Sequence, residues 1–459
     1  MKETRPFSMK DKIGYTLGDL GCCCTEQFRA MYLAIFYTLV LKVNPVHVGI
    51  LMLITKFWDA INDPLIGALV DSHENKGKGK FIPWIKFFAF PTAVLCILGF
   101  VNVSNFAYGA RIAYMFITYI VYEIMYTCVS VPFGSLSSVM TDDVNQRTDL
   151  SRFRSLGGTI FMTVIVIAGP LFLYKDNQPV PSHFLIMSAI CAVIGLICLM
   201  FTSHWCKERI IAEPVTKEKE KLNYFQVIKD ITKNRALLGV MLSSFIGIVG
   251  AGMINGLNTY LFRDYFGNVA IMAVSGMLSV IWSLIAFVGT KFVAKKFGKK
   301  EWIMYSATFS VVVYAILFFF PLDNPMLFII INGICYLGVS GFQVLVWALV
   351  NDAIDYQELQ TGKRNEGIVY SAYTFFRKLA NAVSGSMSSF ALAIAGFQVN
   401  EAVQSEAFSG RLWKTYTGLY VVGYLLAVLV LKFIYPLTKE KTAEMLQNLS
   451  DKRNAATEE

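Results

Sequence analysis

Long apolar runs alternate with short polar connections along most of this 459-residue chain. A helix needs about 20 apolar residues to cross the hydrocarbon core of a bilayer. By that criterion the pattern predicts twelve membrane-spanning helices and an all-α polytopic membrane protein. The predicted spans are 13–41, 46–71, 82–103, 109–138, 153–174, 182–203, 236–264, 269–293, 301–320, 324–351, 367–396 and 411–436.

One long hydrophilic segment, residues 203–235, divides the spans six and six. Each half also has a basic, glycine-containing loop between its second and third spans, starting at Asp71 and at Lys291. Matching halves of this kind are typical of the parallel repeats of transporters, so the pattern predicts a major-facilitator architecture. The expected parts are an N-terminal half (1–203), a cytoplasmic middle loop (204–235), a C-terminal half (236–436) and a cytoplasmic tail (437–459).

Composition and charge support a membrane location. Residues are 55% hydrophobic and only 16% charged, whereas soluble domains carry about 25% charged residues. The net charge of +9 comes from lysines and arginines in alternate connections, which favours a bilayer over nucleic acid as the partner. By the positive-inside rule both termini are cytoplasmic, which requires an even number of spans. We therefore expect a multi-pass protein of the cell's cytoplasmic (inner) membrane, with a polar start that is no cleavable signal and a monomeric state.

The cysteines indicate no metal or disulfide framework. Eight of the nine lie in apolar segments, and Cys206 lies at the start of the middle loop. No CxxC pair recurs at metal spacing, so free buried thiols are expected. No phosphate-binding loop, catalytic triad or metalloenzyme spacing is present in the sequence either. We expect no enzyme activity and no cofactor.

The stretch "FWDAINDPLIG" places Asp59 and Asp63 inside the second span. Each charge costs about 2.5–3.5 kcal/mol at the centre of a membrane helix, so such residues normally face the bundle interior or a wet cavity. The two aspartates are four residues apart and share one helix face, with Asn62 beside them. Pro64 removes a backbone donor there. The pattern predicts an oxygen-rich site for Na⁺ or a shared proton; the alternative is a structural salt bridge to a lysine.

The stretch "YSAYTFFRKLANAVSG" places Arg377 and Lys378 inside the eleventh span, which again implies a cavity. Thr374 shares a face with Lys378, and Tyr373 shares one with Arg377. Lys378 would balance the aspartates. The planar fork of Arg377 suits a carboxylate or sulfonate of a substrate. Alternatively, Arg377 pairs with an acid of the protein, for which Glu123 and Glu26 are candidates.

Hydroxyl groups and further charges occupy the first and fourth spans. Thr127 and Ser130 could ligate a cation or a polar substrate, although membrane Ser and Thr often bond carbonyls of their own helix. In the first span, Glu26 and Arg29 are spaced to neutralise each other, and Asp19 lies near the cytoplasmic end. Spacing alone assigns none of these three as a ligand.

These motifs resemble the glycoside-pentoside-hexuronide:cation symporters, the melibiose-permease family of the major facilitator superfamily. The resemblance covers nearly the whole chain and is carried by "KIGYTLGDLG", "FWDAINDPLIGALVDS", "GKGKFIPW", "VPFGSL", "QRTDLSRFRSLGG" and "WALVNDAIDYQELQTGKRNEGIVYSAYTFFRKL". It implies a secondary active transporter that couples the entry of a sugar or glycoside to a cation by alternating access.

The resemblance also implies roles for single residues. Asp59, Asp63, Asn62 and Thr127 match the family's cation site, where Na⁺ would bind if it is the coupling ion. Lys378 matches the lysine that links the cation and sugar sites. Three more matches are Arg154, a basic residue of the sugar cavity, Thr374, a sugar-site hydroxyl, and Lys56, a basic residue one turn before the aspartates.

Departures from the melibiose carrier bear on the substrate. That carrier has sugar-binding aspartates where this chain has Cys23 and Ser130, and a tryptophan in place of Gly134. The resemblance thus implies that Cys23 and Ser130 lie in the substrate site. The loss of two anionic groups, together with the adjacent Arg377 and Lys378, favours an acidic sugar. The Arg–Lys pair is similar to that of the glucuronide and sulfoquinovose carriers.

We therefore expect Na⁺- or H⁺-coupled symport of a glucuronide, a hexuronide or a sulfonated sugar. The alternatives are a neutral glycoside or pentoside, a lysolipid or drug carrier, and a sensor or membrane-embedded enzyme that keeps only the fold. Charged cytoplasmic loops would latch the two halves. The residues expected to take part in coupling and gating are Lys56, Asp71, Asp355, Arg364 and Glu366.

Overall fold

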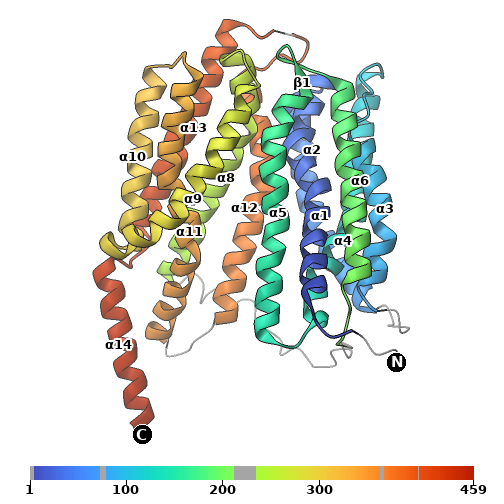
Figure 1. Cartoon of the computed structure of the whole chain (residues 1–459). Coiled ribbons are helices and arrows are strands. Elements are labelled where there is room, and N and C mark those ends of the chain that lie inside the picture. The colour runs from blue at the N-terminus through green and yellow to red at the C-terminus, as the bar shows by residue number, and fades with distance from the viewer. Residues whose placement is uncertain (1–4, 73–78, 211–233, 362–365, 402, 459) are drawn as a thin grey trace. The chain divides into compact units, whose positions relative to one another are not determined.

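The structure is a computed structural model that describes residues 5–72, 79–210, 234–361, 366–401 and 403–458. These residues form two compact helical units (Figure 1). Unit 1 contains α1 (Met9–Ile35), η1 (Phe36–Val40), α2 (Pro45–Ser72), α3 (Ile82–Leu98), α4 (Tyr108–Met140), α5 (Val144–Leu173) and α6 (Pro181–Trp205). Unit 2 contains α8 (Arg235–Tyr260), η2 (Leu261–Tyr265), α9 (Ile271–Phe297), α10 (Lys299–Phe319), α11 (Pro325–Thr361), α12 (Glu366–Ile394), α13 (Glu406–Phe433) and α14 (Lys439–Glu458).

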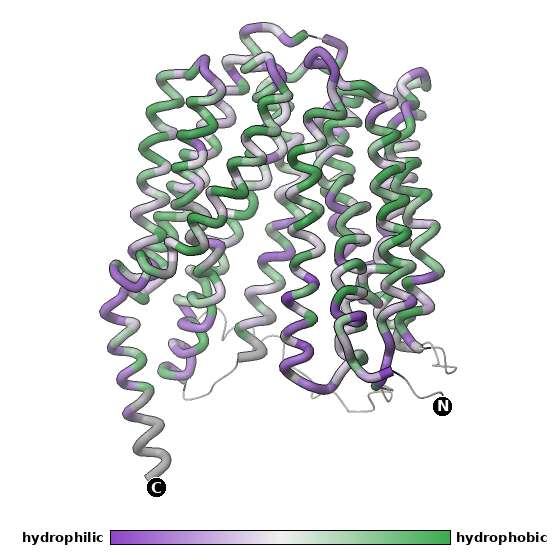
Figure 2. Tube along the Cα trace, in the orientation of Figure 1, coloured by the Kyte–Doolittle hydropathy of each residue, from purple (hydrophilic) through white to green (hydrophobic). Residues whose placement is uncertain are grey.

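A helix lies over each range that the hydrophobic pattern predicts to be a span. Within the described residues, seven helices are long and apolar enough to cross a membrane: α4, α5, α6, α8 with η2, α9, α10 and α13. The helices α1, α2, α11 and α12 are the ones that hold the charged motifs, and α3 has only 17 residues. Figure 2 shows hydrophobic residues covering most of the helices and hydrophilic residues gathering at the connections and on α14.

The two units repeat one packing scheme. In unit 1, α1 packs against α5 and α6, α3 packs against α4 and α6, and α2 packs against α4. In unit 2, α8 packs against α12 and α13, α10 packs against α11 and α13, and α9 packs against α11. The first helix of each unit therefore has the same neighbours as its counterpart, as expected for parallel repeats.

The repeat extends to a local backbone irregularity. α1 and α8 each end in one turn of π-helix, η1 and η2, which is a rare element in proteins. The N–H of Leu41 donates to the carbonyl of Phe36 at 3.0 Å, and the N–H of Phe266 donates to that of Leu261 at 3.1 Å. The next bonds, Val43 to Tyr37 and Asn268 to Phe262, are both 2.9 Å long. Each residue of these bonds in unit 1 has its counterpart in unit 2, 225 positions later in the sequence.

Two elements were not expected from the sequence. A short hairpin, β1 (Tyr174–Lys175) and β2 (Gln178–Pro179), follows α5 in the connection to α6. Its turn residues Asp176 and Asn177 have φ values of 49° and 61°, as a type I′ turn requires. The tail also forms a helix, α14, whose Met445 and Leu449 are buried in the core of unit 2. A predicted polar tail is thus partly an element of the fold.

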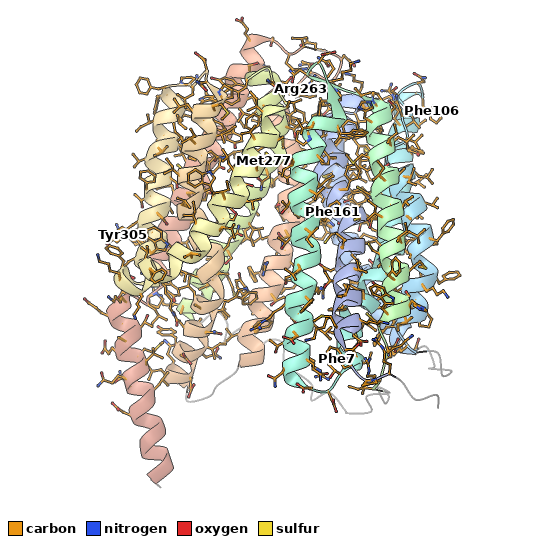
Figure 3. All side chains as sticks on the ribbon, viewed as in Figure 1. Phe7, Phe106, Phe161, Arg263, Met277 and Tyr305 are labelled. Atoms are coloured by element: carbon orange, nitrogen blue, oxygen red, sulfur yellow. The ribbon has the colours of Figure 1, made fainter. Side chains whose placement is uncertain are left out.

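Small residues allow close helix contacts inside unit 1. A Cβ atom on Gly157 of α5 would lie 2.5 Å from the carbonyl oxygen of Thr16 and 2.7 Å from the amide nitrogen of Leu20 on α1. Gly21 of α1 and Gly195 of α6 are similarly close. Small residues are the usual means of bringing membrane helices together. Large apolar side chains instead point outward, as Figure 3 shows for Tyr305 and Phe106, which are 64% and 53% exposed.

The contact at Gly157 gives a prediction about stability. Gly157→Ala places its Cβ against the backbone of α1, which cannot yield as a side chain can, so we expect destabilisation by about 1–3 kcal/mol. The matched control is Gly109→Ala in α4, because a Cβ there meets nothing within 4 Å. Thermal unfolding in detergent, followed with a thiol-reactive dye that reports exposure of the buried cysteines, measures both. Equal unfolding temperatures for the two variants would contradict the prediction.

Candidate functional site

The faces of α2 separate lipid-facing from polar residues. Phe57, Ile61, Leu65 and Leu69 form an exposed apolar stripe with four-residue spacing. At about 100° per residue, Asp63 lies roughly 180° around the helix from the centre of that stripe. The sequence therefore turns the acidic motif away from the apolar face, as expected for ionisable groups within a membrane.

Four predicted cation-site residues lie on α2 and α4 of unit 1. The hydroxyl of Thr127 donates to Oδ1 of Asp63 at 3.2 Å, which joins the two helices. Asn62 is buried, and its Nδ2 has no hydrogen-bond partner. Asp59 is half-buried, with Oδ1 buried and without a partner. Together they supply two carboxylates, an amide and a hydroxyl, which are the oxygen donors that a hard cation prefers.

Lys56 already pairs with one of these carboxylates. Its Nζ lies 2.8 Å from Oδ2 of Asp59, one turn along the same helix. The sequence left open whether the aspartates bind a cation or a lysine. Unit 1 contains such a salt bridge, and it is formed within α2 rather than between helices.

More buried charges surround this cluster. Glu123 of α4 and Arg29 of α1 are 3% and 2% exposed. The expected neutralising pair between Glu26 and Arg29 is wrong, because Oε2 of Glu26 and all three guanidinium nitrogens of Arg29 are buried without hydrogen-bond partners. The guanidinium instead stacks on Tyr122, with Cζ 3.4 Å from the ring centroid. Aromatic stacking thus takes the place of the expected salt bridge.

Arg154 and Cys23 meet at Asp19. Nε of Arg154 lies 3.0 Å from Oδ1 of Asp19, and the amide of Gly158 donates to Oδ2 at 2.9 Å. The thiol of Cys23 lies 3.9 Å from the same Oδ2. Asp19, which spacing alone did not single out, therefore organises two of the predicted substrate residues. The side chain of Ser130 is half-buried on α4.

Unit 2 contains a cavity of about 410 Å³ between α8, α11, α12 and neighbouring helices. It holds the aromatic side chains of Trp347 and Tyr373 and the guanidinium of Arg377. Cζ of Arg377 lies 5.7 Å from the Trp347 ring centroid, and no salt bridge to Arg377 occurs among the described residues of its unit. Its charged fork is thus available to a ligand in this cavity.

The four predicted residues of α12 are divided between two faces. Tyr373 and Arg377 line the cavity, whereas Thr374 and Lys378 do not. The Thr374 hydroxyl donates to the carbonyl of Tyr370 at 2.9 Å, so it satisfies its own helix. Tyr373 is buried and accepts from the hydroxyl of Ser244 at 3.4 Å.

Several polar residues of the cavity were missed. They are Ser243, Ser244, Asn255, Gln343, Asn381 and Ser384. The sequence contains part of the pattern that could have identified these residues. Asn381 follows Arg377 by one helical turn, and α8 has a small or polar residue at every fourth position from Ser243 to Asn255. Because α8 reads as an ordinary apolar span, only the fold shows that this face lines a cavity.

The predicted gating residues are only partly described. Arg364 and the side chains of Asp71 and Glu366 lie outside the described residues. Asp355 is half-buried on α11. Near it, Asp352 forms a salt bridge with Lys299 of α10, with Nζ 2.7 Å from the carboxylate. No role in gating follows from these contacts.

Comparison with known proteins matches this architecture. The family described as MFS/sugar transport protein matches residues 14–439. The symporter YjmB of Bacillus subtilis (strain 168) is 32% identical over 450 residues, which cover 97% of this chain and 96% of the relative. The glucuronide carrier protein homolog of Escherichia coli (strain K12) is 24% identical, with coverages of 97% and 96%. The isoprimeverose transporter of Lactiplantibacillus pentosus is 27% identical, with coverages of 98% and 93%.

Solved structures show the same fold. A bacterial homologue of the human lysosomal transporter Spinster, in an inward-facing and unoccupied conformation, superposes with a TM-score of 0.67 at 10% identity. That match covers 97% of this chain and 99% of the other. The overall architecture is therefore the all-helical major-facilitator fold. With a family match over nearly its whole length, the chain belongs to the MFS/sugar transport protein family.

Proposed function

We propose that this protein is a symporter that couples the uptake of an acidic sugar or glycoside to Na⁺ or H⁺. Its family and relatives are transporters rather than enzymes, and it is a multi-pass protein of the inner membrane. The observation that carries cation coupling is the cluster on α2 and α4, where the hydroxyl of Thr127 donates to Asp63 and Oδ1 of Asp59 is buried without a partner. Buried polar groups normally have partners, so this carboxylate oxygen is fitted to a cation.

In the proposed cycle, the cation binds among Asp59, Asn62, Asp63 and Thr127 and reduces the negative charge there. The sugar then binds, and the loaded carrier changes its accessible side by the rocking of two six-helix halves. Twelve spans with both termini in the cytoplasm are part of this proposal. Each ligand favours the binding of the other, and such linkage is reciprocal. Lys378 carries the link between the two sites in this scheme.

The substrate's charge is proposed from Arg377. Its guanidinium faces a cavity and makes a cation–π contact with the ring of Trp347. It has no acid partner among the described residues of unit 2. A planar guanidinium binds a carboxylate or sulfonate through two parallel hydrogen bonds. The aromatic rings of Trp347 and Tyr373 offer apolar surface to a sugar ring. The glucuronide carrier homolog among the relatives supports the same substrate class.

A neutral glycoside or pentoside is the second candidate. Two observations favour it: most polar groups of the cavity are amides and hydroxyls, which suit sugar hydroxyls, and one relative is an isoprimeverose transporter. A lysolipid carrier or a non-transporting sensor has no comparable support. Counterflow in proteoliposomes distinguishes a carrier, which exchanges substrate, from a sensor, which only binds it.

Removing one aspartate tests the cation site. We expect Asp59→Asn or Asp63→Asn to abolish accumulation driven by a Na⁺ or pH gradient, because the coupling charge is lost while the sugar cavity is intact. Sugar exchange without a gradient should persist. Asp149→Asn is the matched control, since Asp149 pairs with Lys12 at the start of α5, away from the cluster. Uptake and counterflow in proteoliposomes measure both; full accumulation by either aspartate variant would refute the site.

Arg377 tests the sign of the substrate. Arg377→Ala should weaken a uronate or sulfonate ligand about 10- to 100-fold, as expected for the loss of hydrogen bonds to a charged group worth about 1.5–3 kcal/mol. Matched neutral sugars should lose much less. Arg377→Lys keeps the charge without the fork and should be intermediate. Lys414→Ala, an exposed site on α13, is the control. An equal loss for acidic and neutral sugars would make Arg377 a structural residue.

A further inference from the structure

The salt bridge in α2 raises a question about cation binding. The ammonium of Lys56 lies 2.8 Å from Oδ2 of Asp59 and neutralises a carboxylate that the proposed cation also needs. A cation can use that oxygen only after Lys56 has moved. A lysine side chain has a flexible four-carbon stem, so it can change partners. It would not move to a position without an acceptor, because a buried unpaired ammonium is costly.

Two acceptors are present in the same unit. Glu123 of α4 is 3% exposed, and its Oε1 has no hydrogen-bond partner. Oε2 of Glu26 on α1 is also buried without a partner. Both glutamates interact electrostatically with the ammonium of Lys56, as Asp59 does. α2 packs against α4 and α4 contacts α1, so the helices that carry Lys56 and the two glutamates are neighbours in unit 1.

Arg29 does not satisfy these acids. Its three guanidinium nitrogens have no hydrogen-bond partners, and it stacks on the rings of Tyr122 and Tyr119 at 3.4 and 4.8 Å. Its charge acts on Glu123 through space, but Arg29 donates no hydrogen bond to Oε1 of Glu123. The glutamate oxygens are therefore open to a mobile donor, and Lys56 supplies an ammonium on α2, the helix that packs against α4.

The charges are also unequal in number. Glu26, Asp59 and Glu123 are acidic, whereas the bases that the described contacts place in this group are Arg29 and Lys56. A bound monovalent cation lowers the excess of negative charge without removing either base. An acceptor for the displaced lysine is then still available, because two glutamates remain.

We propose that Lys56 is a switchable counter-ion: it occupies Asp59 before the cation binds and transfers to Glu123 and Glu26 when the cation takes its place. The proposal rests on the cation site of the proposed function and concerns its regulation. Glu123 and Glu26 are positioning residues that set the apparent cation affinity through Lys56. Direct attraction of the cation by these glutamates would act whether or not Lys56 is present, and this difference makes the proposal testable.

The test is a mutant cycle on the purified full-length protein. The variants are Lys56→Gln, the pair Glu26→Gln with Glu123→Gln, and all three together. Half-saturation is measured for Na⁺, Li⁺ and H⁺ by calorimetry and tryptophan fluorescence, for which Trp58 adjoins Asp59. Asp63→Asn identifies the signal that belongs to the cation site. Unfolding temperatures without cation check that each variant is folded, and Glu123→Asp replaces any variant that is not.

We expect the glutamate pair to weaken cation binding about 10-fold, because Lys56 then stays on Asp59. Lys56→Gln should strengthen binding about 10-fold, because the competitor is gone. In the Lys56→Gln background, loss of the glutamates should change affinity less than about 2-fold, and Glu123→Asp should restore part of the loss when Lys56 is present. Such non-additivity identifies coupled residues.

Two results would overturn the proposal. If the glutamate substitutions weaken binding equally with and without Lys56, the glutamates attract the cation directly, and only the switch is refuted. If no saturable cation binding depends on Asp63, the proposed cation site fails, and the switch fails with it. The Asp63→Asn control separates the two failures.

Discussion

The cost of placing a charge inside an apolar medium governs this structure. Each ionic group in a membrane span must find a partner, a cavity or a ligand. Asp19 meets this demand with Arg154, and Asp59 meets it with Lys56. Arg377 meets it with a cavity and an aromatic ring. The polar faces of α1, α2, α4 and α12 follow from this constraint, and those faces hold most of the residues proposed to bind a ligand within the spans.

The two units use the same helices for different chemistry. Residues of η1 correspond to residues of η2 that lie 225 positions later in the sequence. By the same separation, Asp59 and Asp63 of α2 correspond to Leu284 and Val288 of α9. The acidic site thus has no counterpart in unit 2. By the same correspondence, Asp19 of α1 matches Ser244 of α8, which borders the cavity. Equivalent faces therefore line polar regions in both units, one rich in carboxylates and the other in hydroxyls and amides.

Sequence reasoning recovered what depends on local pattern. Hydrophobic runs located the helices, and the four-residue spacing of Asp59 and Asp63 placed them on one face of α2. It could not choose among partners for Lys56 or Arg29, because aspartates, glutamates and tyrosines all lie within reach along the chain. Nor could it find Asn255 or Ser384, since one polar residue in an apolar helix looks the same whether it faces a cavity or a neighbour. The partner of a charged side chain and the face that lines a cavity depend on how the helices pack, and the spacing of residues along the sequence does not encode that packing.

The wide turns at the ends of α1 and α8 bear on the origin of this arrangement. An irregular turn at the same place in both units, closed by the same hydrogen bonds, is more simply inherited once than acquired twice. The ancestral half then already carried this backbone, while Asp59 and Asp63 occur in unit 1 alone; at the same separation Arg377 corresponds to another arginine, Arg152. The acidic site of unit 1 is in that case younger than the shape of the two halves: duplication supplied two copies of a scaffold, and only one of them carries the pair of aspartates.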